Sequence, residues 1–228
     1  MSAPSLRARV RSEMNQEIKQ VARRHLAAEG ANLSLRGVAR DMGIVASALY
    51  RYFPSRDALL TALIIDAYDA LGTAATEAEA AVPRDNLRGR WLATCHAART
   101  WALAHPAEYG LLYGNPVPGY SAPQETVPLA AKVVFLLAGV VADGAENLEP
   151  LPPVPIPAPV RADLRRTIDQ HSGDMPEERL DRVFAAWTHL FGLISFEVFG
   201  RLDDVIESRA DYFDHHMSLM ADQAGIPR

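Results

Sequence analysis

The stretch SLRGVARDMGIVASALYRYFPSRDALL, residues 34–60, decides how this chain folds. Its first part has the apolar periodicity of a short helix with one buried stripe. Ser34 precedes that helix and is placed to cap it, because its hydroxyl can accept a hydrogen bond from a free backbone N–H group. The apolar side chains recur at i, i+3, i+4 and i+7: Leu35, Val38, Ala39 and Met42.

A turn and a second helix follow. Gly43 interrupts the apolar run, and its missing Cβ suits the left-handed backbone of a tight turn. Ile44 is expected to fill the corner between the two helices. The second helix is predicted over residues 45–53, with Leu49 and Phe53 facing the core. The pattern is that of a helix-turn-helix.

The outward side of the second helix carries Ala46, Ser47, Tyr50 and Arg51. A helix of this kind can enter the major groove of DNA. The charge pattern agrees, since residues 1–60 hold ten basic and five acidic residues (net +5) while the rest of the chain has a net charge of -10. A basic module on an acidic body concentrates attraction for phosphate at one end. A merely solvated helix surface is the alternative.

These residues resemble the tetracycline-repressor (TetR) family of bacterial regulators over residues 14–66. An apolar stripe of the preceding helix, expected to close at Gly30, belongs to the same resemblance. Val45 and Ala48 depart from it, because the family often has Ser or Thr there. The motif residues are Gly43, Ile44, Leu49, Tyr50, Arg51, Tyr52, Phe53, Pro54, Ser55, Arg56, Ala58, Leu59 and Leu60, and the stripe is Ile18, Val21, Ala22 and Leu26.

The resemblance implies an all-α protein with a helix-turn-helix DNA-binding domain over residues 1–56. A helical effector-binding and dimerisation domain would occupy residues 57–228. Its expected partners are a near-palindromic operator in double-stranded DNA, a mostly apolar small molecule and a second copy of the chain. No cofactor, metal or membrane partner is expected.

Side-chain chemistry suggests roles for the DNA-reading residues. The guanidinium groups of Arg36 and Arg51 suit the O6 and N7 acceptors of guanine. Ala46 can contact a thymine methyl group, and Ser47 can form a weak hydrogen bond. By resemblance, three further residues touch phosphates or adjacent base edges: Tyr50, Tyr52 and Arg56.

Two of these interpretations have alternatives. Tyr52 shares a face with Ala48, so it is either a DNA contact or a core residue. Arg7, Arg9 and Arg11 form either a minor-groove arm or a solvated terminus.

Beyond Ser55 the pattern predicts helices joined by proline-marked loops. The proline-rich residues 149–159 predict an extended connector without a helix, and a plain linker is favoured over a recognition motif. The helices are expected over residues 57–81, 86–104, 106–113, 126–147, 176–199 and 204–224.

The helix at 176–199 is apolar on nearly every side from Trp187 onward, which predicts a central position or a partner surface. By resemblance, the last two helices pair with their twins in a dimer, with Phe191, Phe196 and Phe199 at the interface. This region resembles a TetR C-terminal subtype with Trp and His-Gly signatures. Trp187 and Gly192 match that subtype, whereas Phe191 stands where its His is expected.

Large aromatic residues predict an effector pocket in the body, with core packing as the alternative. A regulator controlled by a protein partner or by no ligand stays open, as does an enzyme with an appended DNA reader. No nucleophile elbow, phosphate loop or metal motif supports catalysis. No run of about 18 apolar residues spans a membrane, and the single Cys95 fits a reducing, cytoplasmic location. The expected pocket residues are Trp101, Tyr109, Tyr113, Phe135 and Trp187.

Overall fold

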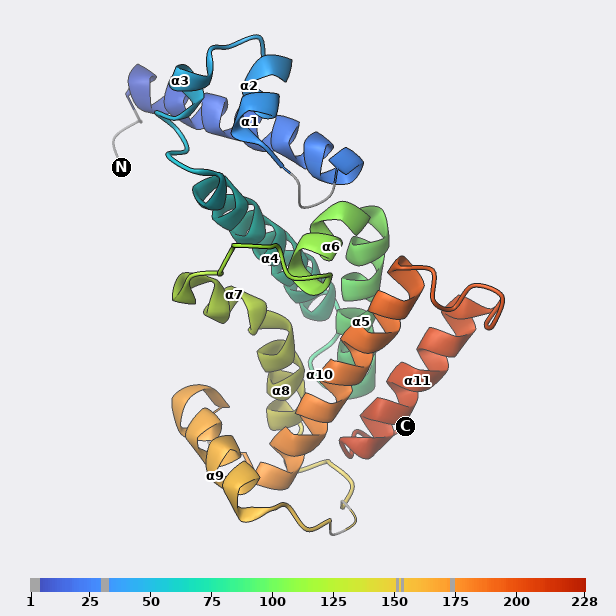
Figure 1. The fold of residues 1–228 in the computed structure, drawn as a ribbon. Helices are drawn as coiled ribbons and strands as arrows, with labels where there is room; N and C mark the ends of the chain where they lie inside the picture. The colour runs from blue at the N-terminus through green and yellow to red at the C-terminus, as the bar shows by residue number, and fades with distance from the viewer. Residues whose placement is uncertain (1–4, 30–32, 151, 153, 173–174) are drawn as a thin grey trace. The chain divides into compact units, whose positions relative to one another are not determined.

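The computed structural model describes residues 5–29, 33–150, 152, 154–172 and 175–228. Within them the chain is all-helical and contains no strand, as predicted (Figure 1). The residues form two compact units. The first unit comprises the residues up to Asp69 together with His105–Val127, and the second comprises Ala70–Ala104 and Pro128–Arg228.

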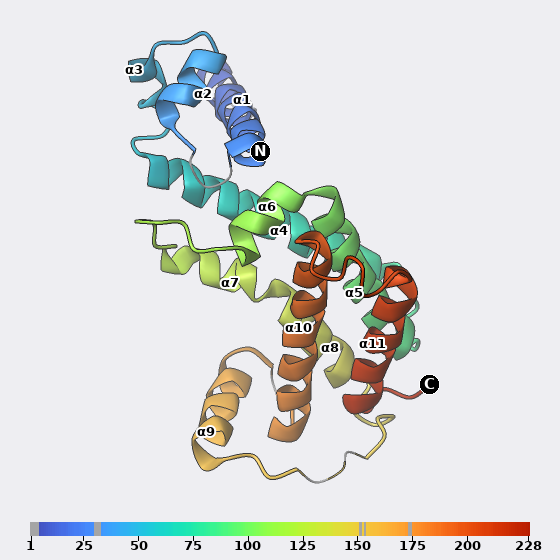
Figure 2. The ribbon, with the colours of Figure 1, turned by 45° about the vertical axis from the view of Figure 1, so that its right-hand side comes forward.

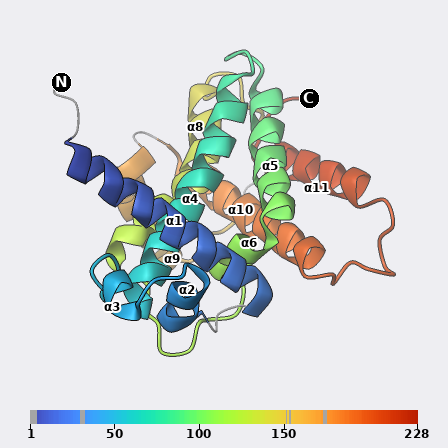
Figure 3. The ribbon, with the colours of Figure 1, turned by 90° about the horizontal axis from the view of Figure 1, so that it is seen from above.

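The first unit is built on the helix-turn-helix. Its three N-terminal helices lie together in Figure 3, where α2 and α3 lie on the same side of α1. The first part of α4 and the whole of α6 also belong to this unit. Its helices are α1 (Leu6–Glu29), α2 (Leu35–Asp41), α3 (Ala46–Leu49), α4 (Arg56–Ala80, continuing into the second unit) and α6 (Pro106–Tyr113).

A single apolar cluster holds the first unit together. The predicted stripe of α1 is fully covered, as are the residues of α2 and α4 that face it. Val117, from the loop after α6, joins this cluster, and Tyr120 packs against it. The Tyr120 hydroxyl also lies 2.9 Å from the Thr61 hydroxyl on α4. The loop after α6 is therefore part of the core around the helix-turn-helix.

The second unit is a helical bundle. Figure 1 shows α10 running between α8 and α11, and α10 contacts α5, α8 and α11. The backbone is seen from another side in Figure 2. Its core includes Trp91 and Leu180, both fully buried. Its helices are the end of α4, α5 (Leu87–Ala104), α7 (Val127–Ala130), α8 (Lys132–Asp143), α9 (Ala158–Thr167), α10 (Glu177–Val198) and α11 (Arg209–Gln223).

Several predicted boundaries are wrong. The helix expected over residues 126–147 is split into α7 and α8, with a 41° bend at the break. The connector ends earlier than predicted, because Pro159 lies in the first turn of α9, where the missing N–H of proline is tolerated. The helix α9 itself was not predicted. The last helix begins at Arg209 rather than at 204, because Gly200 and Asp204 take positive φ and form turns.

By length and composition, the helix α4 could cross a membrane, since its mean hydropathy reaches 1.4. The bent pair of α7 and α8 is also long and apolar enough if the two helices are taken as one span. The apolar stripe of α4 is nevertheless covered by protein, as Leu59, Leu63 and Leu71 are each at most 1% exposed. Core helices of globular proteins can have the same length and hydropathy, so we interpret α4 as a core helix.

Candidate nucleic-acid interface

The backbone of the helix-turn-helix follows from three local features. Ser34 caps α2, and its hydroxyl accepts a hydrogen bond from the Gly37 N–H at 3.0 Å. Gly43 has φ of +67°, which confirms the predicted left-handed turn. Val45 provides no side-chain cap for α3, in line with the missing hydroxyl. The turn is thus held by its glycine and by packing of the partly buried Ile44.

The second helix is shorter than predicted. Regular α-helix ends at Leu49, and the chain continues through Tyr50 to Tyr52 as turns. The N–H groups of Arg51 and Tyr52 donate to carbonyls three residues earlier, which tightens the backbone. Leu49 and Phe53 are buried as predicted, so the side of this segment that faces away from the core is the predicted one.

The predicted base-reading residues lie on the surface of the first unit. Arg36, Ser47 and Arg51 are exposed, and Tyr50 is 43% exposed. Within the described residues, no hydrogen bond or ion pair engages the guanidinium group of Arg36 or Arg51. Both forks are therefore available for an external acceptor. Ala46 is partly buried against the core.

Tyr52 and Arg56 are more enclosed. Tyr52 is partly buried and packs against the core, which favours the core interpretation for its ring. The Arg56 Nε donates to the Leu33 carbonyl at 3.1 Å, so this side chain also ties α4 to the segment before α2. Gly30, the expected end of the first helix, lies outside the described residues.

The minor-groove arm is not extended. The helix α1 already begins at Leu6, so Arg7, Arg9 and Arg11 lie on a helix and are exposed. Apolar residues at helical spacing continue through this region, with Leu6 and Val10 on one side. That continuation was the signal in the sequence for a longer helix.

Ion pairs stabilise the frame behind this surface. Asp66 on α4 accepts a hydrogen bond from Lys19 at 2.9 Å and one from Arg23 at 2.8 Å, both from α1. Arg23 lies 3.8 Å from Glu108 on α6. The His25 Nε2 lies 2.7 Å from an Asp41 carboxylate oxygen, and this hydrogen bond lowers the pKa of Asp41. These contacts fix α1, α2, α4 and α6 within one unit.

The residues expected to line an effector pocket fall in two groups. Tyr109 is fully buried in the first unit, where its ring lies 5.0 Å from that of Tyr113. Trp101, Phe135 and Trp187 belong to the second unit. Phe135 stacks on His171 with ring centroids 4.7 Å apart.

Trp187 has an unsatisfied donor. Its indole Nε1 is buried and has no hydrogen-bond partner among the described residues. The half-buried ring makes edge-on contacts with the rings of Phe184 and Phe191, with centroids 6.0 and 6.2 Å away. A buried N–H without an acceptor is costly, so this atom is a candidate contact for a bound molecule.

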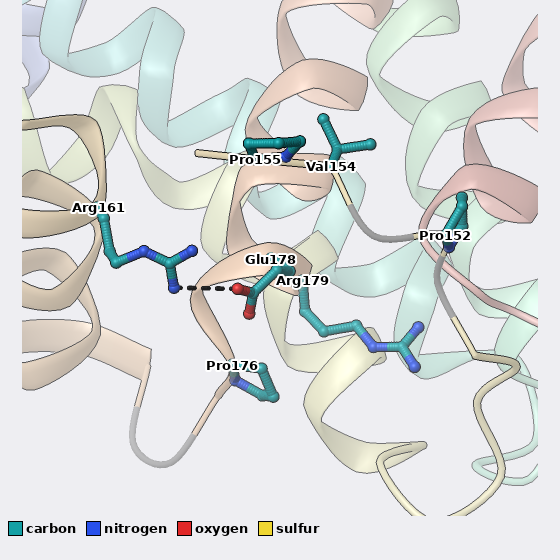
Figure 4. Close-up of a pocket in the computed structure, with 7 residues that line it drawn as sticks. All are labelled: Pro152, Val154, Pro155, Arg161, Pro176, Glu178 and Arg179. Atoms are coloured by element: carbon teal, nitrogen blue, oxygen red, sulfur yellow. Dashed lines mark hydrogen bonds and ion pairs between the residues drawn. The ribbon is translucent and has the colours of Figure 1, made fainter. Parts of the chain in front are cut away.

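The second unit also contains a surface cavity of about 550 Å³, shown in Figure 4. The Arg161 guanidinium pairs with Glu178 at 3.0 Å on one side of it. Arg179 points away from this pair and donates to the carbonyls of Glu149 and Ala224. The remaining described wall is formed by proline and valine, so the charged groups of this cavity already have partners.

The expected dimer residues differ in exposure. Phe191 is 7% exposed and packs inside the second unit, whereas Phe196 and Phe199 are 49% and 42% exposed. Gly192 lies on the same side of α10, and a Cβ added there would meet nothing within 4 Å. This face of α10 is therefore open and partly apolar.

A helix-turn-helix with an exposed, unpaired basic surface defines a DNA-binding protein. Residues 18–63 match the family of bacterial regulatory proteins, tetR family, and residues 91–220 match the tetracyclin repressor-like C-terminal domain. The chain belongs to the TetR family of transcriptional regulators. This family is not one of enzymes; its members bind DNA and typically form dimers.

Similar proteins cover nearly the whole chain. The HTH-type transcriptional regulators Rv1816 of Mycobacterium tuberculosis and Mb1846 of Mycobacterium bovis are each 36% identical over 215 residues, 92% of this chain and of each relative. The crystal structure of the regulatory protein SCO4313 has a TM-score of 0.80 at 31% identity, over 96% of this chain and 100% of that chain. A tetR-family regulator from Rhodococcus RHA1 shares the fold, with a TM-score of 0.64, 15% identity and 94% and 98% coverage.

Proposed function

We propose that this regulator reads a specific operator in double-stranded DNA through α2, α3 and the turn after α3. The observation that carries the proposal is the pair of exposed guanidinium groups of Arg36 and Arg51 on one helix-turn-helix, neither of which pairs with another described residue. Each presents the fork that guanine recognition requires. Ser47 and Tyr50 would add polar contacts, while Ala46 would contact a thymine methyl group. Tyr52 and Arg56 would support the phosphate contacts.

We further propose that the chain acts as a homodimer on a near-palindromic site. Phe196, Phe199 and the open Gly192 form an exposed face on α10, next to α11. Two such faces related by a twofold axis would bury the phenylalanines and bring two DNA readers to adjacent half-sites. Phe191, being buried, would support this face from behind.

The regulation proposed is release from DNA by a mostly apolar small molecule, which makes the protein a repressor. The unsatisfied Trp187 indole N–H supports an effector with one hydrogen-bond acceptor within an apolar body. Trp101 and Phe135 would line its site in the second unit, whereas the other two expected pocket residues, Tyr109 and Tyr113, belong to the first unit. An effector that prefers the arrangement unable to bind DNA would shift the population away from the operator.

One observation favours a second candidate, a regulator controlled by a protein partner or by no ligand. Tyr109 is fully covered and packs on Tyr113, which in turn contacts Tyr68 at a ring distance of 6.2 Å. Burial raises the pKa of both Tyr68 and Tyr113, as expected for core tyrosines. These two pocket residues therefore act as core packing in the second candidate.

By function, we propose that residues 1–56 bind DNA and residues 57–228 serve effector binding and dimerisation. This functional division places α6 with the effector region, although it packs in the first unit. The protein would work in the cytoplasm without a membrane partner.

Electrophoretic mobility shifts test the proposal. The probe is DNA from upstream of the protein's own gene, with a scrambled duplex as control. Specific retardation of the probe, reversed by a small molecule from a screen, is the expected result. DNA should in turn weaken that molecule's binding, because coupling is reciprocal. Retardation that no compound reverses, with no compound shifting the melting temperature, would favour the second candidate. Equal binding to both duplexes would contradict a specific operator.

A further inference from the structure

The N-terminal part of α1 forms a basic groove with the turn that follows α3. This part of α1, from Leu6 onward, precedes the family match, which begins at residue 18. The groove has a volume of about 390 Å³. Figure 1 shows α3 on the same side of the first unit as this end of α1. Its walls are formed by Leu6, Arg7, Val10 and Arg11 of α1 and by Arg51 and Tyr52.

The groove is positively charged, and none of the described residues that line it is acidic. Arg7, Arg11 and Arg51 are exposed, and none of them forms an ion pair or side-chain hydrogen bond with another described residue. The acidic residues of this part of α1, Glu13 and Glu17, line a different surface hollow. Three unpaired guanidinium groups around one groove favour an anionic occupant.

The groove also has an apolar component. Leu6 is 74% exposed and Val10 is 50% exposed, and both lie on the same face of α1 as the two arginines. Residues 6 and 10, and likewise 7 and 11, are four positions apart, which is about one helical turn, so the two pairs lie side by side on a face that excludes Arg9. A DNA backbone offers both components that the groove requires, since its phosphates are anionic and its deoxyribose rings are largely apolar.

We propose that this groove is a second DNA contact, in which Arg7 and Arg11 bind backbone phosphates beside the recognition residues. Arg51 lies in both the groove and the proposed base-reading surface, so the two surfaces are continuous. The inference rests on the proposed function and adds to it a sequence-independent phosphate clamp carried by the helical extension. Leu6 and Val10 would pack against the sugars between the bound phosphates.

The test compares the salt dependence of binding to a short mixed-sequence duplex, which needs no knowledge of the operator. Replacing both residues (Arg7→Ala with Arg11→Ala) should lower the affinity on the order of ten-fold and the slope of log K against log salt by about 2 per protomer. The matched control Arg9→Ala should keep both values close to those of the wild type. The double variant Arg7→Lys with Arg11→Lys should keep the wild-type slope, because the phosphate contact needs charge.

The outcomes separate this inference from the proposed function. If the wild-type protein binds no duplex at low salt, the proposed function itself fails. If it binds, but the double alanine variant keeps the wild-type affinity and slope, only the phosphate clamp is overturned. An equal loss in the Arg9→Ala variant would also overturn it, because the groove would have no special role. Unchanged DNA binding with lost binding to anionic lipid vesicles would assign α1 to a membrane surface instead.

Discussion

At the scale of single residues, the proposed reading of DNA depends on side chains that no other described residue engages. Arg36 and Arg51 have no partner among the residues that the structure describes, whereas Arg56 donates to the Leu33 carbonyl. Arginine thus has two roles within one motif: Arg36 and Arg51 can bind DNA, whereas Arg56 also binds the protein's own backbone. The difference is one of geometry, because a guanidinium group already engaged by the protein has fewer donors left for DNA.

The first prediction concerns specificity. Arg51→Ala or Arg36→Ala should cost about 1–3 kcal/mol at the operator and relax the preference at one base pair in each half-site. Tyr50→Phe is the comparison, because losing a phosphate contact weakens binding to all sequences alike. Binding constants on operator variants and on random DNA provide the measurement. Equal losses on both kinds of DNA for Arg51→Ala would contradict a base-reading role.

At the scale of elements, a buried ion-pair network joins the end of α4 to α5 and α8. Arg90 is 1% exposed, and its guanidinium donates to Glu79 at 2.5 Å and to Asp143 at 2.6 Å. Arg84 reaches the same two carboxylates from the solvent side. The three helix ends are therefore held by charge as well as by apolar packing.

The second prediction tests this network by stability. Arg90→Ala should lower the free energy of unfolding by about 3 kcal/mol, because it leaves the buried carboxylate of Glu79 with only the solvent-side Arg84 as a partner. Arg84→Ala is the matched control and should cost less than about 1 kcal/mol, since its side chain is 66% exposed. Urea denaturation of both variants measures the difference. Similar losses of unfolding free energy in the two variants would show that burial of the guanidinium group does not determine how much an ion pair contributes to stability.

A histidine pair joins α10 to α11. The His189 Nε2 lies 3.0 Å from the His216 Nδ1. Burial lowers the pKa of both residues. The charge of His216 lowers the pKa of His189 further, and the charge of His215 does the same for His216. His215 and Tyr212 contact the His216 ring. The folded state therefore favours neutral imidazoles where α10 packs against α11.

The third prediction follows from the sign of those shifts. The unfolded chain binds protons more readily at these histidines, so folding stability should be complete above their ordinary pKa of about 6.5 and should decline as the pH falls below it. His216→Gln should flatten this decline, while the exposed His171 serves as a control when replaced by Gln. Melting temperatures across this pH range provide the measurement. An unchanged acid-side slope in the His216 variant would contradict the prediction.

At the scale of the whole molecule, the open face of α10 leads to the fourth prediction. Phe196→Glu or Phe199→Glu should yield monomers, because two charges would be buried in the proposed interface without partners. Val160→Glu on α9 is the control, since Val160 is also exposed, at 42%. Sedimentation velocity and operator binding would show a smaller species with weaker affinity. A stable monomer of the unaltered protein at micromolar concentration would refute the dimer.

The sequence by itself determined the features that depend on neighbouring residues. The cap at Ser34, the turn at Gly43 and the start of α6 at Pro106 are local, because they follow from one hydroxyl, one missing Cβ and one missing N–H. Apolar periodicity likewise predicted the buried stripes of α1 and α4. Together with the family resemblance of residues 14–66, these signals were sufficient for the fold class and the family.

Only the tertiary structure decided what depends on distant contacts. It placed Val117 and Tyr120 in the core of the helix-turn-helix unit, and it covered Phe191 while leaving Phe196 exposed. It also brought Arg7 and Arg11 to one groove with Arg51, some forty positions away along the chain. Burial and proximity of this kind depend on which helices pack together, and short-range periodicity carries no information about that choice.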